Sequence, residues 1–318
     1  MVGGALFIRS RLDQRTEDKA NPPDLVCATE LAVICERIAN ETDVNVTLEP
    51  AGQTVSRAVA LNGAENIDGW LTAAPWPAIL DQRRQARSLP AMFTTQTPPV
   101  LARSPIVMAV WPDRAAALRQ ACPLQQPGWK CLGEVAGKDL WKNVPGGREI
   151  WGPVKIALSD PEQQALGGIA FTAGAIEFFN RSDLSTIDFE DDAFRDWVSN
   201  LKAATPVTSS PDMTAVLARG ESATDVFVGL EADIAPAIEE SRRQPKPVVL
   251  YPSAVVNFDL TLAVIPGRAG ERLQEVVQEA VKDQLADMGW KVPGTPAGVL
   301  PDPGVLDALR QVWKEAAG

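Results

Sequence analysis

The sequence predicts an α/β protein of two lobes, each built on a mixed, mostly parallel sheet flanked by helices. Apolar strand-like runs alternate with amphipathic helix-like segments along most of the chain. The 318 residues are too many for one compact core and suit two domains of ordinary size. A hydrophobic content of 45% with 22% charged residues is typical of a globular chain, which excludes disordered and fibrous classes.

The predicted first lobe starts at Asp24. Its strands are expected at residues 25–27, 44–49 and 67–72, and its helices after Thr29, from residue 51 and from Ala78. Thr29 is placed to cap the first of these helices, and hydroxyl groups lie in the first turn of the second. Strands and helices alternating at this spacing favour a parallel sheet, and ligands bind at the carboxyl edge of such sheets.

A long apolar strand at residues 103–111 is expected to cross from the first lobe to the second. Further strands are predicted at residues 154–158, 225–230, 248–252 and 260–267. The segment 248–252 follows a proline-rich stretch and is the expected return crossing. Amphipathic helices are predicted through Phe194 and Leu201, through Leu273 and Leu285 as far as Gly289, and after Asp302.

These elements place residues 24–103 with 251–318 in a discontinuous first lobe and residues 104–250 in the second. Residues 1–23 are a linker or the trimmed end of a membrane anchor. Residues 1–8 are apolar but far shorter than the ~20 residues that span a bilayer, and no signal peptide with a cleavage site is visible. Three arginines that follow them weigh against export of this side of the chain.

Charge and composition exclude several functions. A formal net charge of -11, with Lys and Arg scattered, argues against nucleic acid and anionic membranes as partners, since both need a concentrated basic patch. The chain has no histidine. Serine or cysteine nucleophiles activated by histidine and His-ligated metal sites are therefore excluded, and we expect neither a metal nor a cofactor.

The four cysteines fall into two close pairs, Cys27 with Cys35 and Cys122 with Cys131. Neither pair has the spacing of a zinc site or a thioredoxin-type motif. Three disulfide connectivities are open, and the short separations favour pairing within each close pair; four free buried thiols are the alternative. Disulfides would place the protein outside the cytosol, at the cell surface or in the periplasm, with an anchor preceding residue 9 if residues 1–8 are its trimmed end.

The segment 154–171 is the most informative junction of a strand and a helix. The residue before Pro161 is disfavoured in the α region, so the strand should stop by Asp160. A helix should begin between Gln163 and Gly168. Its first N–H groups and the helix dipole would suit a carboxylate or another oxyanion, although an ordinary connection in an α/β core is the alternative.

The order of these features resembles the type 2 periplasmic or extracellular solute-binding proteins, including the molybdate- and sulfate-like binding group. The resemblance covers residues 24–289. It is carried by the following segments: Cys27-Ala-Thr-Glu, Asp68-Gly-Trp-Leu-Thr-Ala, Leu101-Ala-Arg-Ser-Pro-Ile-Val-Met-Ala-Val, Ile156-Ala-Leu-Ser-Asp-Pro, Ala223-Thr-Asp-Val-Phe-Val-Gly-Leu-Glu and Tyr251-Pro. The chain also resembles solute-binding domains of actinobacterial surface proteins, some of which are joined to a von Willebrand factor A domain.

The resemblance implies an extracytoplasmic protein that closes two lobes around a small polar solute, for transport or sensing and without catalysis. Its partners would then be an ABC permease or an associated surface domain. A surface interaction or sensory domain with the same fold but no tight small-molecule site is the alternative. Oxyanion-binding members usually have Ser or Thr where this chain has Glu30 and the turn Glu162-Gln-Gln-Ala-Leu, so the ligand's charge stays open.

Candidate ligand-binding residues lie at the predicted helix starts and strand ends: Thr29, Glu30, Gln53, Thr54, Asp160, Gln163, Gln164, Glu231 and Tyr251. Each has a plain structural alternative. Asp160, Gln53 and Thr54 suit turns or helix caps, and Glu231 suits a solvated helix start. Trp76 and Tyr251 would stack on a ligand or pack in the core.

Enzyme signatures are weak. Ser199 and Lys202 fit a Ser-x-x-Lys pattern, but the accompanying Lys-Thr-Gly motif is missing. The segment Gly133-Glu-Val-Ala-Gly-Lys-Asp is one residue short of a phosphate-binding loop. Glu190, Asp191 and Asp192 are interpreted as a cluster at a helix N-terminus. We therefore predict no catalytic residues.

Overall fold

The computed structural model describes residues 22–60, 65–93, 95, 98–205, 212–253, 255–282, 284–291 and 300–316. Within these ranges a curled mixed sheet has the strand order β2-β1-β3-β8-β4-β6-β5, with β7 beside β4. The strands are β1 (Asp24–Ala28), β2 (Asn45–Glu49), β3 (Gly69–Ala73), β4 (Val100–Val110), β5 (Ile156–Ala157), β6 (Val226–Leu230), β7 (Val248–Leu250) and β8 (Asn257–Val264). The anchor and linker predicted before residue 22 lie outside the described residues.

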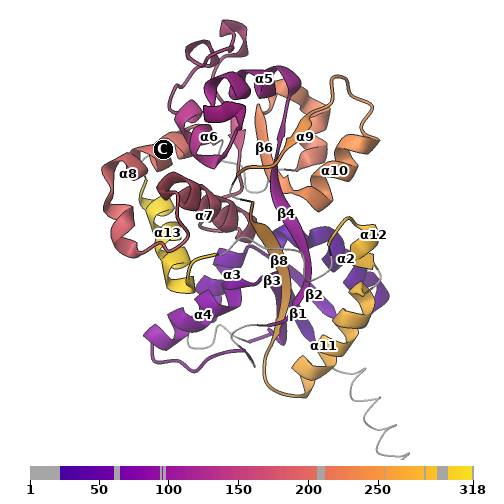
Figure 1. Ribbon diagram of the computed structural model, residues 1–318. Helices are drawn as coiled ribbons and strands as arrows, with labels where there is room; N and C mark the ends of the chain where they lie inside the picture. The colour runs from indigo at the N-terminus through magenta and orange to yellow at the C-terminus, as the bar shows by residue number, and fades with distance from the viewer. Residues whose placement is uncertain are drawn as a thin grey trace, which may run out of the picture.

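Helices cover the sheet in both lobes (Figure 1). They are α2 (Ala32–Glu41), α3 (Ala51–Ala58), α4 (Pro75–Ala86), α5 (Pro112–Ala121), α6 (Trp129–Ala136), α7 (Ala165–Phe179), α8 (Asp192–Ala203), α9 (Met213–Arg219), α10 (Glu231–Glu240), α11 (Arg268–Val281), α12 (Gln284–Asp287) and α13 (Pro303–Glu315). Short 3-10 turns include η1 (Thr29–Leu31) and η5 (Thr186–Glu190).

The two lobes share the long strand β4. Its first half, from Val100 to Pro105, pairs with β8 in the lower lobe of Figure 1, and its second half, from Ile106, pairs with β6 and β7 in the upper lobe. The chain returns to the lower lobe between β7 and β8. The long strand expected to cross between the lobes is therefore observed, since one continuous strand pairs with β8 in the lower lobe and with β6 and β7 in the upper lobe.

Parallel and antiparallel pairs have different places in the sheet. The pairs β1–β2, β1–β3 and β5–β6 are parallel. Every antiparallel pair contains β4 or β8. The mixed α/β sheet predicted from the alternation is confirmed, and its antiparallel pairs are made by the shared strand β4 and by β8, which follows the return of the chain to the lower lobe.

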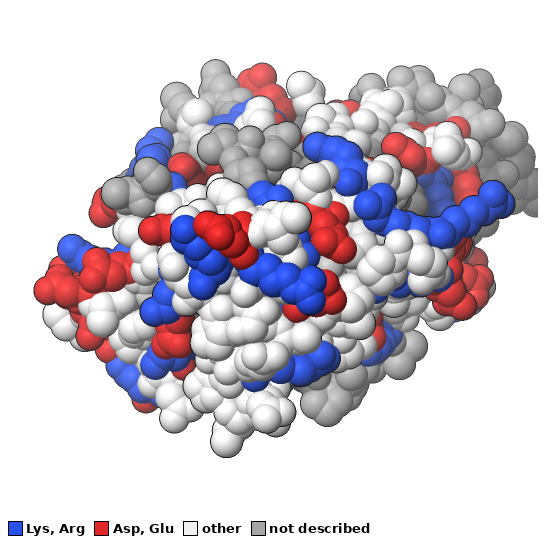
Figure 2. Space-filling model, turned by 90° about the horizontal axis from the view of Figure 1, so that it is seen from above, with Lys and Arg blue, Asp and Glu red and all other residues white. Residues whose placement is uncertain are grey.

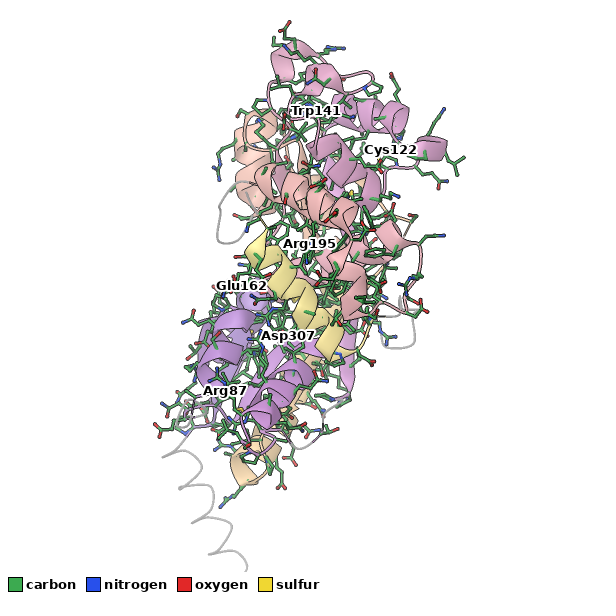
Figure 3. The ribbon with its side chains drawn as sticks, turned by 90° about the vertical axis from the view of Figure 1, so that its left-hand side faces the viewer. Arg87, Cys122, Trp141, Glu162, Arg195 and Asp307 are labelled. Atoms are coloured by element: carbon green, nitrogen blue, oxygen red, sulfur yellow. A yellow bond between two sulfur atoms is a disulfide. The ribbon has the colours of Figure 1, made fainter. Side chains whose placement is uncertain are left out.

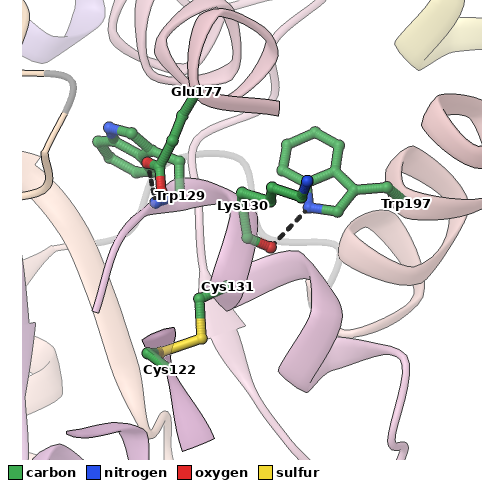
Figure 4. The surroundings of a disulfide bond; sticks show 6 residues. All are labelled: Cys122, Trp129, Lys130, Cys131, Glu177 and Trp197. Carbon is green, nitrogen blue, oxygen red and sulfur yellow. Dashed lines mark hydrogen bonds between the residues drawn. A yellow bond between two sulfur atoms is a disulfide. The ribbon is translucent and has the colours of Figure 1, made fainter. Parts of the chain in front are cut away.

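Both predicted disulfides are formed, Cys27 with Cys35 and Cys122 with Cys131. The first joins β1 to α2 at the edge of the lower lobe. The second joins the end of α5 to α6 (Figure 4). Beside it, α6 is held by two further contacts: the amide of Trp129 donates to Glu177 Oε2 at 2.6 Å, and Trp197 Nε1 donates to the carbonyl of Lys130 at 2.9 Å.

Several predicted boundaries are corrected. Thr29 does not cap a helix, because residues 29–31 form the turn η1 and its hydroxyl donates to Glu30 Oε2 at 3.3 Å. The helix expected from Ala78 begins at Pro75, since proline is well tolerated in a first turn. The strand expected at 154–158 is reduced to β5, which pairs with a neighbour on one side only among the described strands.

Candidate functional site

The loops that follow the strands of the lower lobe touch the start of α7 in the upper lobe. After β1, the carboxylate of Glu30 accepts a hydrogen bond from the amide of Leu166 at 2.8 Å. After β2, the amide of Gly52 donates to the carbonyl of Gln163 at 2.8 Å. The carboxyl edges of the two sheets therefore meet at one place, as the predicted ligand cleft requires.

Glu30 occupies the position at α7 where a bound anion was expected. α7 is a 15-residue helix whose first turn is almost wholly buried, and its free N–H groups point at this carboxylate. Burial raises the pKa of Glu30, while hydrogen bonds from the amides of Leu166 and Ala165 act in the opposite direction. The protein supplies its own oxyanion to the helix that the sequence singled out.

Gly52 allows the backbones of the two lobes to approach closely. A Cβ atom at this position would lie 2.4 Å from the carbonyl oxygen of Glu162, a distance that no side chain tolerates. Next to it, Gln53 is exposed, whereas Thr54 is buried and donates to Glu49 Oε2 at 2.6 Å. Thr54 is therefore committed to its own lobe rather than to the interface.

Three further predicted ligand-binding residues, Asp160, Gln163 and Gln164, lie in the turn between β5 and α7. Asp160 Oδ1 accepts a hydrogen bond from the amide of Glu162 at 2.9 Å. Asp160 is therefore a turn-forming residue, which was the structural alternative to a ligand contact. Gln164 is the residue immediately before α7 and is buried. Glu30 and Gln163 thus contact the opposite lobe, with Thr29 and Gln164 next to them in the chain. Binding of a solute by any of these four residues stays a prediction.

The C-terminal helix α13 spans both lobes on this side of the molecule (Figures 1 and 3). Its Arg310 is only 5% exposed, lies with its guanidinium 4.3 Å from the ring centre of Trp76 in α4, and donates through Nε and Nη2 to the carbonyl of Glu162. Asp307 binds Arg83 of α4 at 2.7 Å. Burial lowers the pKa of Arg310 to about 10, so the guanidinium stays charged at neutral pH.

At its far end, α13 is tied to the upper lobe. Lys202 donates to the carbonyls of Trp313 at 2.9 Å and Ala316 at 2.7 Å, and the ring of Trp313 lies 5.3 Å from that of Phe171. A lysine that caps the end of a helix has its protons committed there. The Ser-x-x-Lys pattern is thereby explained as a structural contact between α8 and α13.

Sequence reasoning missed Arg310, although a signal was present. The inner face of α13 carries Leu306, Leu309 and Trp313, and Arg310 falls on the same stripe at helical spacing. A charged residue on an apolar stripe is either paired or functional. The pattern alone did not identify its partners, since both come from segments more than 140 positions away.

Glu231 and Tyr251 form a second cluster near the crossing strands. The hydroxyl of Tyr251 donates to Glu231 Oε1, and Lys291 binds Glu231 Oε2 at 2.6 Å. Partial burial opposes ionisation of Glu231, but the bonds from Lys291 and Tyr251 prevail and hold its pKa below the usual range. The same bond raises the pKa of Tyr251 to about 12. Among the described residues, no hydrogen bond or ion pair joins this cluster to Glu30.

On the other side of the interface, the ion pair of Glu231 with Lys291 joins the lobes, and the helices beside this ion pair enclose a groove. A groove of about 860 Å³ lies between α2 and α12 of the lower lobe and α9 and α10 of the upper lobe. Its walls carry Arg37, Asp233, Glu240, Arg243 and Asp287. Within the described residues, no hydrogen bond or ion pair joins the two walls. This groove was not predicted, because its residues lie on helix faces rather than at strand ends.

The face of the molecule in Figure 2 shows no continuous basic patch of the kind that binds a polyanion. In the view of Figure 2, Lys and Arg side chains lie beside Asp and Glu and are interrupted by uncharged surface. Among the described residues no cluster of three or more Cys, Asp or Glu side chains is arranged to hold a metal. Nor, in that part of the chain, does any helix combine the length and apolarity that a membrane crossing needs.

Comparison with known proteins places these features in context. Residues 27–290 match the protein family described as bacterial extracellular solute-binding protein. Direct comparison with curated protein sequences finds no match. Three solved structures are similar in fold, and at identities of 14–16% they support the fold alone.

The first of these structures is iron-bound HitA from Pseudomonas aeruginosa, with a TM-score of 0.58, 14% identity and coverage of 93% of this chain and 99% of that chain. The second is the periplasmic binding protein AfuA from Actinobacillus pleuropneumoniae with fructose-6-phosphate bound. Its TM-score is 0.56 and its identity 16%, and the match covers 92% of this chain and 94% of that chain. The third is a periplasmic thiamin binding protein, with a TM-score of 0.56, 15% identity and coverage of 94% of this chain and 97% of that chain.

Proposed function

Because the chain belongs to the family of bacterial extracellular solute-binding proteins, we propose that it binds a small polar solute between its two lobes, outside the cytoplasm and without catalysis. The meeting of the strand ends of both lobes at α7 is the observation that carries this proposal. A solute that contacts both lobes favours the closed arrangement by its differential affinity for that arrangement. A membrane permease or a surface domain would then recognise the closed form.

The lobe boundaries belong to the same proposal. We assign residues 24–103 with 251–318 to the first lobe and residues 104–250 to the second. The change of partners along β4 near Pro105 supports this assignment. The helix α13 contacts α4 in the first lobe and α7 and α8 in the second, so it also joins the two lobes.

Among the partners, an ABC permease fits the family, and an associated surface domain of the von Willebrand factor A type is the further candidate from the sequence resemblance. The molybdate- and sulfate-like ligands of that resemblance are less favoured. The carboxylate of Glu30 at the start of α7 repels an oxyanion at that place, unless the anion displaces it. We therefore expect neutral or cationic solutes to bind better than oxyanions.

A thermal-shift screen tests the proposal. The full chain would be heated with anions, amino acids, sugars and polyamines, each at high concentration. A solute at about 100 times its Kd is expected to add about 2.7 kcal/mol to the free energy of unfolding. Small-angle scattering with and without that solute would report closure. Absence of any shift across the library would contradict solute binding.

One observation favours a second function, a surface interaction or sensory domain with no tight small-molecule site. The groups that would hold a solute at α7 are already satisfied by Glu30, Gly52 and Arg310 of the same chain. A permanently closed interface needs no ligand. An unchanged scattering profile with every solute, together with high intrinsic stability, would favour this function over transport.

A further inference from the structure

The acidic side chains near the line where the lobes meet differ in whether they have partners. Glu30 accepts a hydrogen bond from the amide of Leu166 at the start of α7. Glu231 is bound by Lys291 and Tyr251. Asp233, in the first turn of α10, forms no hydrogen bond or ion pair with any described residue and lines the groove. Its carboxylate is therefore available to a ligand.

The two arginines that line the groove also differ in whether they have partners in the protein. Arg243 donates to the carbonyls of Leu217 and Ala218, and its guanidinium lies 5.5 Å from the ring centre of Trp111. Arg37 on α2 is exposed and has no such contacts within the described part of the chain. The lower lobe thus presents a free guanidinium to the groove, and the upper lobe presents a free carboxylate.

We propose that the groove between α2 and α10 is the binding site for a small zwitterionic solute, an amino acid with a second amine. Its ammonium group would bind Asp233, and its carboxylate would bind Arg37. A ligand held in this way joins the two walls of the groove, which no hydrogen bond or ion pair between described residues of the walls does. The inference rests on the proposed function and names its site and its class of solute.

The balance of charge favours a second amine on this solute. Besides Asp233, the carboxylates of Glu240 and Asp287 line the groove, and Arg37 alone among the lining cations is uncommitted. Charge-assisted hydrogen bonds between ammonium and carboxylate are among the stronger polar contacts in proteins. The groove therefore has acceptors for more positive charge than one α-amino group carries.

Apolar surface in the same groove suits the methylene chain of such a solute. Val33 is 57% exposed, and Leu217, Pro236 and Met288 also line the groove. Ligand sites typically combine apolar walls with a few polar groups that fix orientation. The Asp233 side chain is exposed in the groove, and the protein atoms around it raise its pKa to about 6 by desolvation, so at neutral pH its carboxylate is ionised and accessible to an ammonium group.

L-lysine is the probe that tests this site, by calorimetric titration into the full chain at pH 7.5. We expect saturable binding to the unmodified protein. Asp233→Asn keeps the shape of the side chain and should weaken binding at least tenfold, the usual cost of losing a hydrogen bond to a charged group. Arg37→Gln should weaken it severalfold. Asp196→Asn, the same change at an exposed position of α8, is the matched control and should bind as the unmodified protein does.

The outcomes separate this inference from the proposed function. If another solute of the thermal-shift library binds and Asp233→Asn leaves its affinity unchanged, the groove is not the site, while solute binding stands. Binding of sulfate in preference to L-lysine overturns the proposed class of ligand. Absence of binding by any solute overturns both proposals. Asp233→Glu, which keeps the charge, should retain most of the affinity and shows that a loss in Asp233→Asn is not a folding defect.

Discussion

The two sides of the interface between the lobes differ in how they are held. On the side of α7 and α13, Glu30, Gly52 and Arg310 make direct contacts with the opposite lobe. On the side of α2 and α10, a groove of about 860 Å³ separates the walls. The first side is closed along the start of α7 and along α13, whereas on the second side the ion pair of Glu231 with Lys291 lies beside an open groove.

This difference shows how a binding protein can restrict the motion of its lobes. The crossing strands form one connection, and α13 forms another at the opposite edge of the interface (Figure 1). With two connections, any further closure must narrow the open groove rather than close the whole interface. The free Arg37 and Asp233 lie on the two walls that such a motion would bring together.

The largest effect should come from removing Arg310 on the closed side. Arg310→Leu deletes the bonds to Glu162 and Asp307 and the contact with Trp76, and leaves the half-buried carbonyl of Glu162 without this donor. Hydrogen bonds to a charged group contribute about 1.5–3 kcal/mol each. Urea unfolding should show this loss. Arg87→Leu, at an exposed arginine that follows α4, is the control and should change stability little. Equal stability of the two variants would mean that α13 does not hold the lobes together.

A smaller change at Gly52 should open the closed side. In Gly52→Ala the added methyl group meets the carbonyl of Glu162, so the lobes must separate at this point or the backbone must shift, at a cost of about 1–3 kcal/mol. Small-angle scattering should show a larger radius of gyration.

Gly168→Ala is the matched control for this substitution, because it lies at the same interface with space for a methyl group, 3.4 Å from the carbonyl of Pro161. We expect this variant to keep the compact profile and to gain slightly in stability, since alanine favours a helix over glycine. The same profile for both alanine variants would contradict the close contact at Gly52.

Glu30 should make the stability of the closed side depend on pH. Because burial raises its pKa in the folded protein, the folded state binds the proton more tightly than the unfolded state does. The free energy of unfolding should therefore fall as the pH rises from the ordinary carboxyl value of 4.5. Glu30→Gln should remove this decline while its amide oxygen still accepts from Leu166. Glu36→Gln on α2 should keep the decline of stability with pH. Parallel pH curves for the unmodified protein and both variants would exclude Glu30 as the source of this decline.

The smallest effect concerns the open side. The carboxyl carbon of Asp233 should titrate by NMR with a midpoint near its pKa of about 6, above the ordinary value of 3.8. The signal is identified by its absence in Asp233→Asn. Since the folded-state pKa is raised, this group also disfavours the folded state as the pH rises between these two values. A midpoint near 3.8 would show that the groove does not desolvate the carboxylate.

Much of the fold was predictable because it depends on local patterns. The alternation of apolar strands and amphipathic helices predicted the order of elements, and the run through residues 103–111 predicted the crossing strand β4. The short separations of Cys27 from Cys35 and Cys122 from Cys131 predicted both disulfides. In each case the residues that decide the structure are close in sequence.

The site was predictable only in part. Glu30 and Gln163 lie at the interface, as their positions after strands indicated. The sequence could not separate a ligand-binding role from a structural role for Glu30, because the amide that it binds lies 136 residues away in the chain. Whether the other candidates contact a solute stays a prediction. The groove could not be predicted from the sequence, since its walls come from four helices in two lobes.

The sequence by itself determined a two-lobed α/β protein without histidine chemistry, with a helix start after Asp160 and two local disulfides, because periodicity, proline geometry and short loops act over a few residues. Only the tertiary structure decided that Glu30 occupies the start of α7, that Arg310 joins the lobes through α13, and that Asp233 is left free. Which charges are neutralised depends on contacts between distant segments. For that reason the junction before α7, which suggested an anion site in the sequence, is a closed contact in the folded protein.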